Sequence, residues 1–207
     1  MQAALGGFLF KVVVISASGA LSPGPLTVAV LTIGIKGGWR SGFLASVGHT
    51  LAELPLVLCL ALGLSSVLTD PKVKLLTGAL GGSALITFGA LQFVSSLKEE
   101  GGAIKREAAG SSTLIGFTLT LFNPFFILWW VSVGLPLIYD ALSLMGFKGV
   151  AVLYASHVWL DYAWLTSVAH VASMGRRSVR VGRYASLILS LALIPLGANM
   201  IYASLLH

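Results

Sequence analysis

The chain has 207 residues, of which 57% are hydrophobic and only 10% are charged, and its formal net charge is +6. A soluble domain carries about 25% charged residues, because water must solvate its surface. This composition therefore excludes a soluble domain, and its high hydrophobicity also excludes a disordered chain. A single cysteine, Cys59, excludes a disulfide scaffold. We expect an integral membrane protein.

Six apolar runs follow one another along the chain, each of at least 23 residues. They cover residues 12–35, 41–69, 75–97, 108–139, 149–175 and 184–207. About 20 apolar residues are enough for a helix to cross the hydrocarbon core of a bilayer. The sequence lacks the alternating pattern of a membrane barrel. We therefore predict an all-α integral membrane protein with six transmembrane helices in a single domain, 1–207.

Basic residues are concentrated in alternate loops. The loops after the first, third and fifth runs contain Lys36, Arg40, Lys98, Lys105, Arg106, Arg176, Arg177, Arg180 and Arg183. Loops rich in Lys and Arg stay on the cytoplasmic side. We expect these loops in the cytoplasm and both termini outside, in a multi-pass protein of the cell membrane. Topology accounts for the positive charge, so no nucleic-acid partner is expected.

The second half of the chain repeats the first at a shift of 108 residues, which takes His49 onto His157 and Glu53 onto Asp161. Glu53 and Asp161 are the only acids inside the six runs. Each repeat holds three predicted spans, an odd number, so the two repeats enter the membrane in opposite directions, as in many secondary transporters. The predicted parts are repeat one at about 1–97, a cytoplasmic linker at about 98–111 and repeat two at about 112–207.

Proline motifs occupy the centres of the first and fourth runs: Ser22-Pro23-Gly24-Pro25 and Asn123-Pro124. Proline removes a backbone donor and interrupts a helix. Ser22 and Asn123 are interpreted as N-caps, each followed by proline at the first helical position. Each new helix start would offer N–H groups and a positive dipole end to an anion such as a carboxylate. A simple packing kink is the alternative. The predicted substrate-binding residues are Ser22, Pro23, Gly24, Pro25, Asn123 and Pro124.

Two His–acid pairs lie near the centres of the second and fifth runs. His49 and Glu53 are four residues apart, as are His157 and Asp161, so each pair shares one helix face. A charged carboxylate in hydrocarbon is costly, so it faces the bundle interior or takes up a proton. We predict that these four residues couple transport to protons or another ion. Two alternatives stay open: the pairs only hold helices together, or the four side chains bind a metal ion.

Several of these motifs resemble a known family. Ser22-Pro23-Gly24-Pro25, the stretch Gly37-Gly38-Trp39-Arg40-Ser41-Gly42, and Gly48-His49 with Glu53 resemble the LysE-type (LysE/RhtB) exporters. The stretch from Asn123 to Trp130 and the His157–Asp161 pair are similar to one branch of that superfamily. The resemblance covers nearly the whole chain. It implies a six-helix carrier that exports amino acids or related small metabolites, driven by the proton gradient or the membrane potential.

The expected function is therefore secondary active transport, with a metal-ion efflux carrier or an intramembrane metal-binding protein as the alternative. An enzyme is not expected, because no nucleophile, base and orienting group occur together. No cofactor is expected. The expected partners are a small-molecule substrate such as an amino acid, protons or another coupling ion, and the lipid bilayer, and a homodimer is left open.

Overall fold

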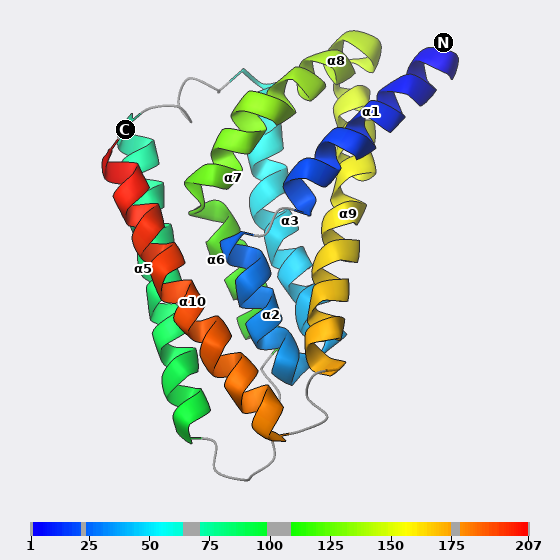
Figure 1. Cartoon of the computed structure of the whole chain (residues 1–207). Coiled ribbons are helices and arrows are strands. Elements are labelled where there is room, and N and C mark those ends of the chain that lie inside the picture. Colours follow the sequence, from blue (N-terminus) through cyan, green and yellow to red (C-terminus); the bar gives the residue numbers. More distant parts are fainter. Residues whose placement is uncertain (1, 22–23, 64–70, 99–108, 175–178, 207) are drawn as a thin grey trace.

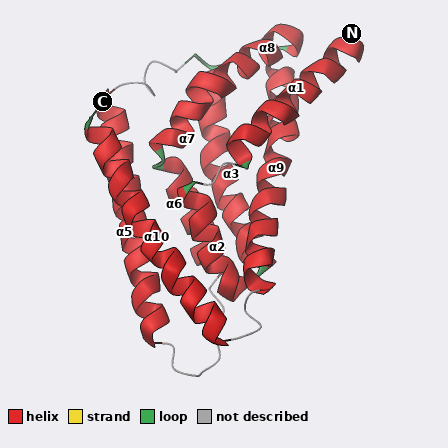
Figure 2. Ribbon diagram, viewed as in Figure 1, coloured by secondary structure: helices red, strands yellow, loops and turns green. Residues whose placement is uncertain are grey.

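The computed structural model of the chain describes residues 2–21, 24–63, 71–98, 109–174 and 179–206. Nearly all of these residues are helical, and no strand occurs among them (Figure 2). This confirms the predicted all-α fold class. The linker predicted at about 98–111 lies mostly outside the described residues.

The first predicted span is broken at its centre. Helix α1 (Gln2–Ala20) ends before the proline motif and α2 (Pro25–Gly37) begins within it, with a bend of 71° between them. The N-cap of α2 is Gly24, with φ −116° and ψ −177°, so the predicted cap at Ser22 is wrong by two residues. A residue that precedes proline is disfavoured in the α conformation, so Gly24 stays extended and the helix starts at Pro25. Ser22 and Pro23 lie outside the described residues.

The fourth predicted span is broken as well. Helix α6 (Ala109–Leu121) is followed by α7 (Pro124–Trp129), a π-helical turn η1 (Trp130–Gly134) and α8 (Leu135–Met145). Asn123 is the N-cap of α7, as predicted, because its Oδ1 accepts a hydrogen bond from the Phe125 N–H at 3.1 Å. The Trp130 ring packs over Gly134, where an added Cβ would collide with it.

The remaining helices are α3 (Trp39–Ala61), α5 (Pro71–Lys98), α9 (Phe147–Met174) and α10 (Val179–Leu205). α3 packs against α6 and α9, and α2 also lies against α9. α5 and α10 run side by side at one edge of the bundle (Figure 1). Both chain ends lie toward the same end of the bundle in this view.

Glycines allow the helices to approach one another closely. A Cβ added at Gly48 would collide with the Thr113 carbonyl, and one at Gly116 would collide with the Ala45 carbonyl, so α3 and α6 touch through their backbones. α5 and α10 cross where Gly82 faces Gly197. Small residues have this function in membrane bundles, where close van der Waals packing drives helix association. The contact between α3 and α6 also fixes the position of the polar residues on α3.

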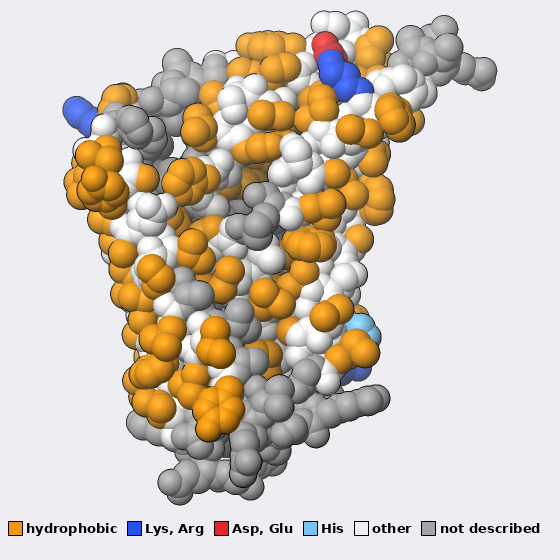
Figure 3. All heavy atoms as spheres, viewed as in Figure 1, with side chains coloured by type: hydrophobic (Ala, Val, Ile, Leu, Met, Phe, Trp, Pro, Cys, Tyr) orange, Lys and Arg blue, Asp and Glu red, His pale blue; other side chains and the backbone are white. Residues whose placement is uncertain are grey.

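Hydrophobic side chains cover most of the visible surface along the helices (Figure 3). Among the described residues, α3 and the segment Phe125–Met145 are each long and apolar enough to cross a membrane. The bent pair Leu5–Ala20 and Pro25–Gly37 makes a third span if it is counted as one element. The chain is therefore a membrane protein. Six spans in two inverted repeats remain a prediction.

Candidate functional site

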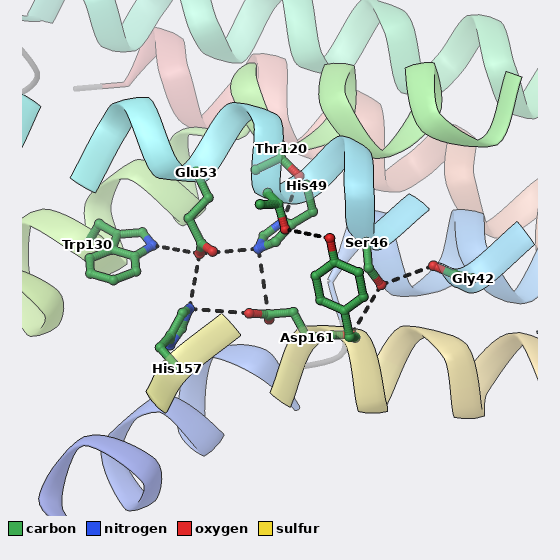
Figure 4. A network of polar contacts seen from close by, with 10 residues as sticks. Gly42, Ser46, His49, Glu53, Thr120, Trp130, His157 and Asp161 are labelled. Atoms are coloured by element: carbon green, nitrogen blue, oxygen red, sulfur yellow. Dashed lines mark hydrogen bonds and ion pairs between the residues drawn. The ribbon is translucent and has the colours of Figure 1, made fainter. Parts of the chain in front are cut away.

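Four buried side chains meet between α3 and α9 in a closed arrangement, the His–acid ring, made of His49, Glu53, His157 and Asp161 (Figure 4). Glu53 Oε1 lies 3.2 Å from His49 Nε2 and 3.1 Å from His157 Nε2. Asp161 completes the ring: its Oδ1 lies 3.8 Å from His49 Nε2 and its Oδ2 lies 3.3 Å from His157 Nε2. Each carboxylate therefore contacts both imidazoles, and the two pairs predicted from the sequence form one site.

The ring is enclosed by protein, since Glu53 is 1% exposed and His49, the most accessible member, only 7%. Removing a charge from water costs several kcal/mol unless a partner compensates it. With both imidazoles protonated, the two carboxylates are balanced and the ring is neutral as a whole. Losing or gaining one proton would leave a net charge in a low-dielectric interior, where electrostatic interactions are strong. The protonation state of the ring therefore affects the stability of this part of the bundle.

Residues outside the four predicted ones hold the ring in place. Trp130 Nε1 donates a hydrogen bond to Glu53 Oε1 at 3.1 Å, and His49 Nδ1 pairs with Thr120 Oγ1 at 2.8 Å. The Trp129 ring stacks on His157, with the two planes inclined by 27°. Trp130 lies in the stretch from Asn123 to Trp130 that resembles the family, but no pattern in the sequence links it to Glu53. Thr120 was not predicted, because threonine is an ordinary residue of apolar helices.

Some polar atoms of the ring are left without a hydrogen bond. Glu53 Oε2, His157 Nδ1 and Asp161 Oδ2 are buried and have no hydrogen-bond partner among the described residues. Asp161 Oδ2 is close to His157 Nε2, but the geometry is not that of a hydrogen bond. Buried polar atoms are nearly always paired, so each exception requires an explanation. Each carboxylate therefore has one oxygen with unused acceptor capacity.

A cavity of about 450 Å³ lies beside the ring and is lined by all four ring residues. Its lining also includes Gly24 and Pro25 at the start of α2, and Asn123 before α7. The structure therefore brings both broken helices and both His–acid pairs to one cavity. Pro124 forms the first residue of α7. The volume lies within the range of about 300–1,000 Å³ that is usual for small-molecule sites.

The donor set of the ring is also compatible with a metal ion. His49, Glu53 and Asp161 each offer one ligand atom, and these atoms lie within 4.8 Å of one another. Imidazole and carboxylate are common ligands of divalent transition metals. In the structure the same atoms pair with one another, so a metal ion would have to replace these contacts.

An apolar helical bundle with interrupted helices and a buried charged ring beside a cavity is the architecture of a membrane transporter. The comparison with known proteins is more specific. The family model of the LysE type translocators matches residues 17–204, and the chain belongs to this family. No curated protein and no solved structure matches the chain.

Proposed function

We propose that this protein is a secondary active exporter that moves amino acids or related small metabolites across the cytoplasmic membrane in exchange for protons. The observation that carries the proposal is the cavity shared by the two broken helices and the His–acid ring. Membership of the LysE type translocator family supports the transport function. The ionisable ring supports the coupling, because ionisable residues inside a membrane are costly and mark ion or substrate pathways.

The proposal includes six transmembrane helices in two inverted repeats. Three observations support it. His49 contacts Asp161 and Glu53 contacts His157, so the two His–acid pairs that are related by the shift of 108 residues lie together. The first predicted span of each half is interrupted at its proline motif, and both chain ends lie toward the same end of the bundle (Figure 1). Inverted repeats place the substrate at their interface near the midplane. Rocking of one repeat against the other would then open the cavity to either side of the membrane.

In this mechanism the broken-helix ends around Pro25 and Asn123 hold the carboxylate of the substrate, because helix starts favour negative charge. The ring binds and releases protons. A substrate that brings a positive charge to Glu53 and Asp161 competes with the protons of the imidazoles for the same carboxylates. Such competition makes the exchange of substrate for protons obligatory.

The test is transport of labelled amino acids by reconstituted protein, with and without a proton gradient. We expect Glu53→Gln and Asp161→Asn, singly and together, to abolish the response of flux to the gradient. Asp140→Asn is the matched control, since this carboxylate is 45% exposed and pairs with Lys11 outside the ring. Flux in the double variant that still follows the proton gradient would contradict the coupling role.

A metal-ion efflux carrier or intramembrane metal-binding protein is the second candidate, favoured by the three ligand atoms within 4.8 Å. It requires a bound divalent ion in stoichiometric amount that is lost in the His49→Ala variant. Elemental analysis of the purified protein measures this directly. Metal-free protein that still transports amino acids would eliminate the second candidate.

A further inference from the structure

We propose that Trp129 is a positioning residue that couples the first helix break to the His–acid ring. Its indole packs on Gly19, at the end of α1, and on His157 of the ring. A movement of α1 at the break therefore reaches the ring through this side chain. The inference rests on the proposed function and adds to it a residue that transmits the effect of the substrate to the proton site.

The contact between Trp129 and Gly19 leaves no free space. Gly19 is the last residue but one of α1, and a Cβ added to it would lie 2.8 Å from Trp129 Cε2 and 3.0 Å from Trp129 Cζ2. Carbon atoms that are not bonded to each other ordinarily stay about 3.5–4.0 Å apart. Any side chain at position 19 would therefore push the indole away. Both contacted atoms belong to the six-membered part of the indole, which a leucine side chain does not reach.

The contact between Trp129 and His157 helps to orient the imidazole. The centroids of the two rings are 6.0 Å apart and their planes are inclined by 27°. The hydrogen bond at one imidazole nitrogen sets the state of the other nitrogen, and at His49 this bond comes from Thr120. His157 Nδ1 has no such partner in the part of the chain that the structure describes. Packing against Trp129 and Trp130 therefore orients this imidazole.

The break between α1 and α2 allows the end of α1 to move. The two helices meet at a bend of 71°, and proline removes a backbone donor that would help to join them into one rigid rod. The end of α1 lies between α7 and α9 (Figure 1).

The substrate cavity touches this contact directly, because Gly19, Trp129 and His157 all belong to its lining. Side chains that are packed without voids transmit a displacement to their neighbours. A substrate that shifts the end of α1 therefore shifts the indole, and the indole changes the orientation of the imidazole. The position of α1 and the geometry of the ring are linked in this way.

A cycle of variants tests the coupling: Gly19→Ala, Trp129→Leu and the two together. Gly6→Ala on the same helix is the control, because its added methyl group would meet no atom within 4 Å. The probe is a radiolabelled mixture of the common amino acids, transported by reconstituted protein. The readout is the ratio of the flux with a proton gradient to the flux without one. This ratio does not depend on how much of the protein is folded, so a merely structural role would leave it unchanged.

We expect Gly19→Ala and Trp129→Leu each to lower this ratio by about 5-fold or more, which is a usual size for the coupling between two sites. Gly6→Ala should keep the wild-type ratio. Because the two substitutions act on one contact, adding Gly19→Ala to Trp129→Leu should cause no further loss. An unchanged ratio in either single variant would overturn the inference. A Gly19→Ala effect that persists in full in the Trp129→Leu background would overturn it as well.

Thermal unfolding of the same variants provides a second measurement. Gly19→Ala overpacks the contact and should destabilise the protein, whereas leucine at position 129 leaves room for the new methyl group. If Gly19→Ala alone does not fold, recovery of folding in the double variant supports the contact. A double variant that also fails to fold, while Trp129→Leu alone folds, would overturn the inference.

The outcomes separate this inference from the proposed function. Wild-type flux that does not respond to the proton gradient would contradict the proposed proton exchange, and the inference with it. Wild-type flux that responds to the gradient, together with independent effects of the two substitutions, would overturn the inference and leave the proposed exporter in place.

Discussion

The two acids of the ring occupy equivalent positions in the sequence repeat but differ in their surroundings. Glu53 Oε1 contacts three nitrogen atoms, His49 Nε2, His157 Nε2 and Trp130 Nε1, at 3.1–3.2 Å. Within the described part of the chain, the Asp161 carboxylate pairs with the two imidazoles, at 3.3 and 3.8 Å. The indole N–H therefore stabilises the negative charge of Glu53 more than that of Asp161, because hydrogen bonds to charged groups are stronger than those between neutral groups.

Replacing Trp130 tests this asymmetry. Trp130→Phe removes the donor to Glu53 but keeps an aromatic ring in a site that is 1% exposed. We expect a loss of unfolding free energy of about 1–3 kcal/mol, part of it from the lost hydrogen bond to a buried charge, and a reduced response of flux to the proton gradient. Thermal unfolding and reconstituted flux measure the two effects. Trp159→Phe is the control, since Trp159 is 50% exposed, and an equal loss in both variants would contradict the role of the indole N–H.

At the scale of the elements, the proline motifs correctly predicted where the two helices are interrupted. The residue at which each new helix starts depended on the neighbours of the prolines. Asn123 caps α7 as predicted, whereas α2 starts at Pro25 because Gly24 itself precedes a proline. The π-helical turn at Trp130–Gly134 was not predicted. Such a turn accommodates one extra residue in the helix and often occurs at functional sites. Its formation here accompanies the burial of the Trp130 ring over Gly134, a contact that no local pattern indicates.

The backbone contact between α3 and α6 gives a prediction at the same scale. In Gly48→Ala the new methyl group would collide with the Thr113 carbonyl. We expect destabilisation by about 1–3 kcal/mol, the usual effect of overpacking, together with weaker ligand binding because α3 carries His49. Gly7→Ala on α1 is the control, because its added methyl group meets no atom within 4 Å. Thermal unfolding measures the stability of both variants. Equal stability would show that α3 and α6 are less tightly packed than the structure indicates.

For the whole molecule, the distribution of basic residues predicts the orientation in the membrane. Leu62, at the end of α3, should face outward, and Arg40, at the start of the same helix, should face the cytoplasm. In a Cys59→Ser background, we expect an impermeant maleimide to label Leu62→Cys in intact cells and Arg40→Cys only after permeabilisation. Because both positions lie on one helix, the reverse labelling pattern would show that the orientation is inverted.

The sequence alone determined that the protein lies in a membrane, that it is helical, where two helices are interrupted and which two His–acid pairs lie near the centres of apolar runs. These features depend on composition, proline and residue spacing, which are properties of neighbours along the chain. Only the tertiary structure decided that the two His–acid pairs close into one ring, that Trp130 and Thr120 support it, and that both interrupted helices reach the same cavity. The physical reason is that contacts between helices depend on their register and closeness of approach, and many similar apolar faces in this sequence are compatible with more than one arrangement.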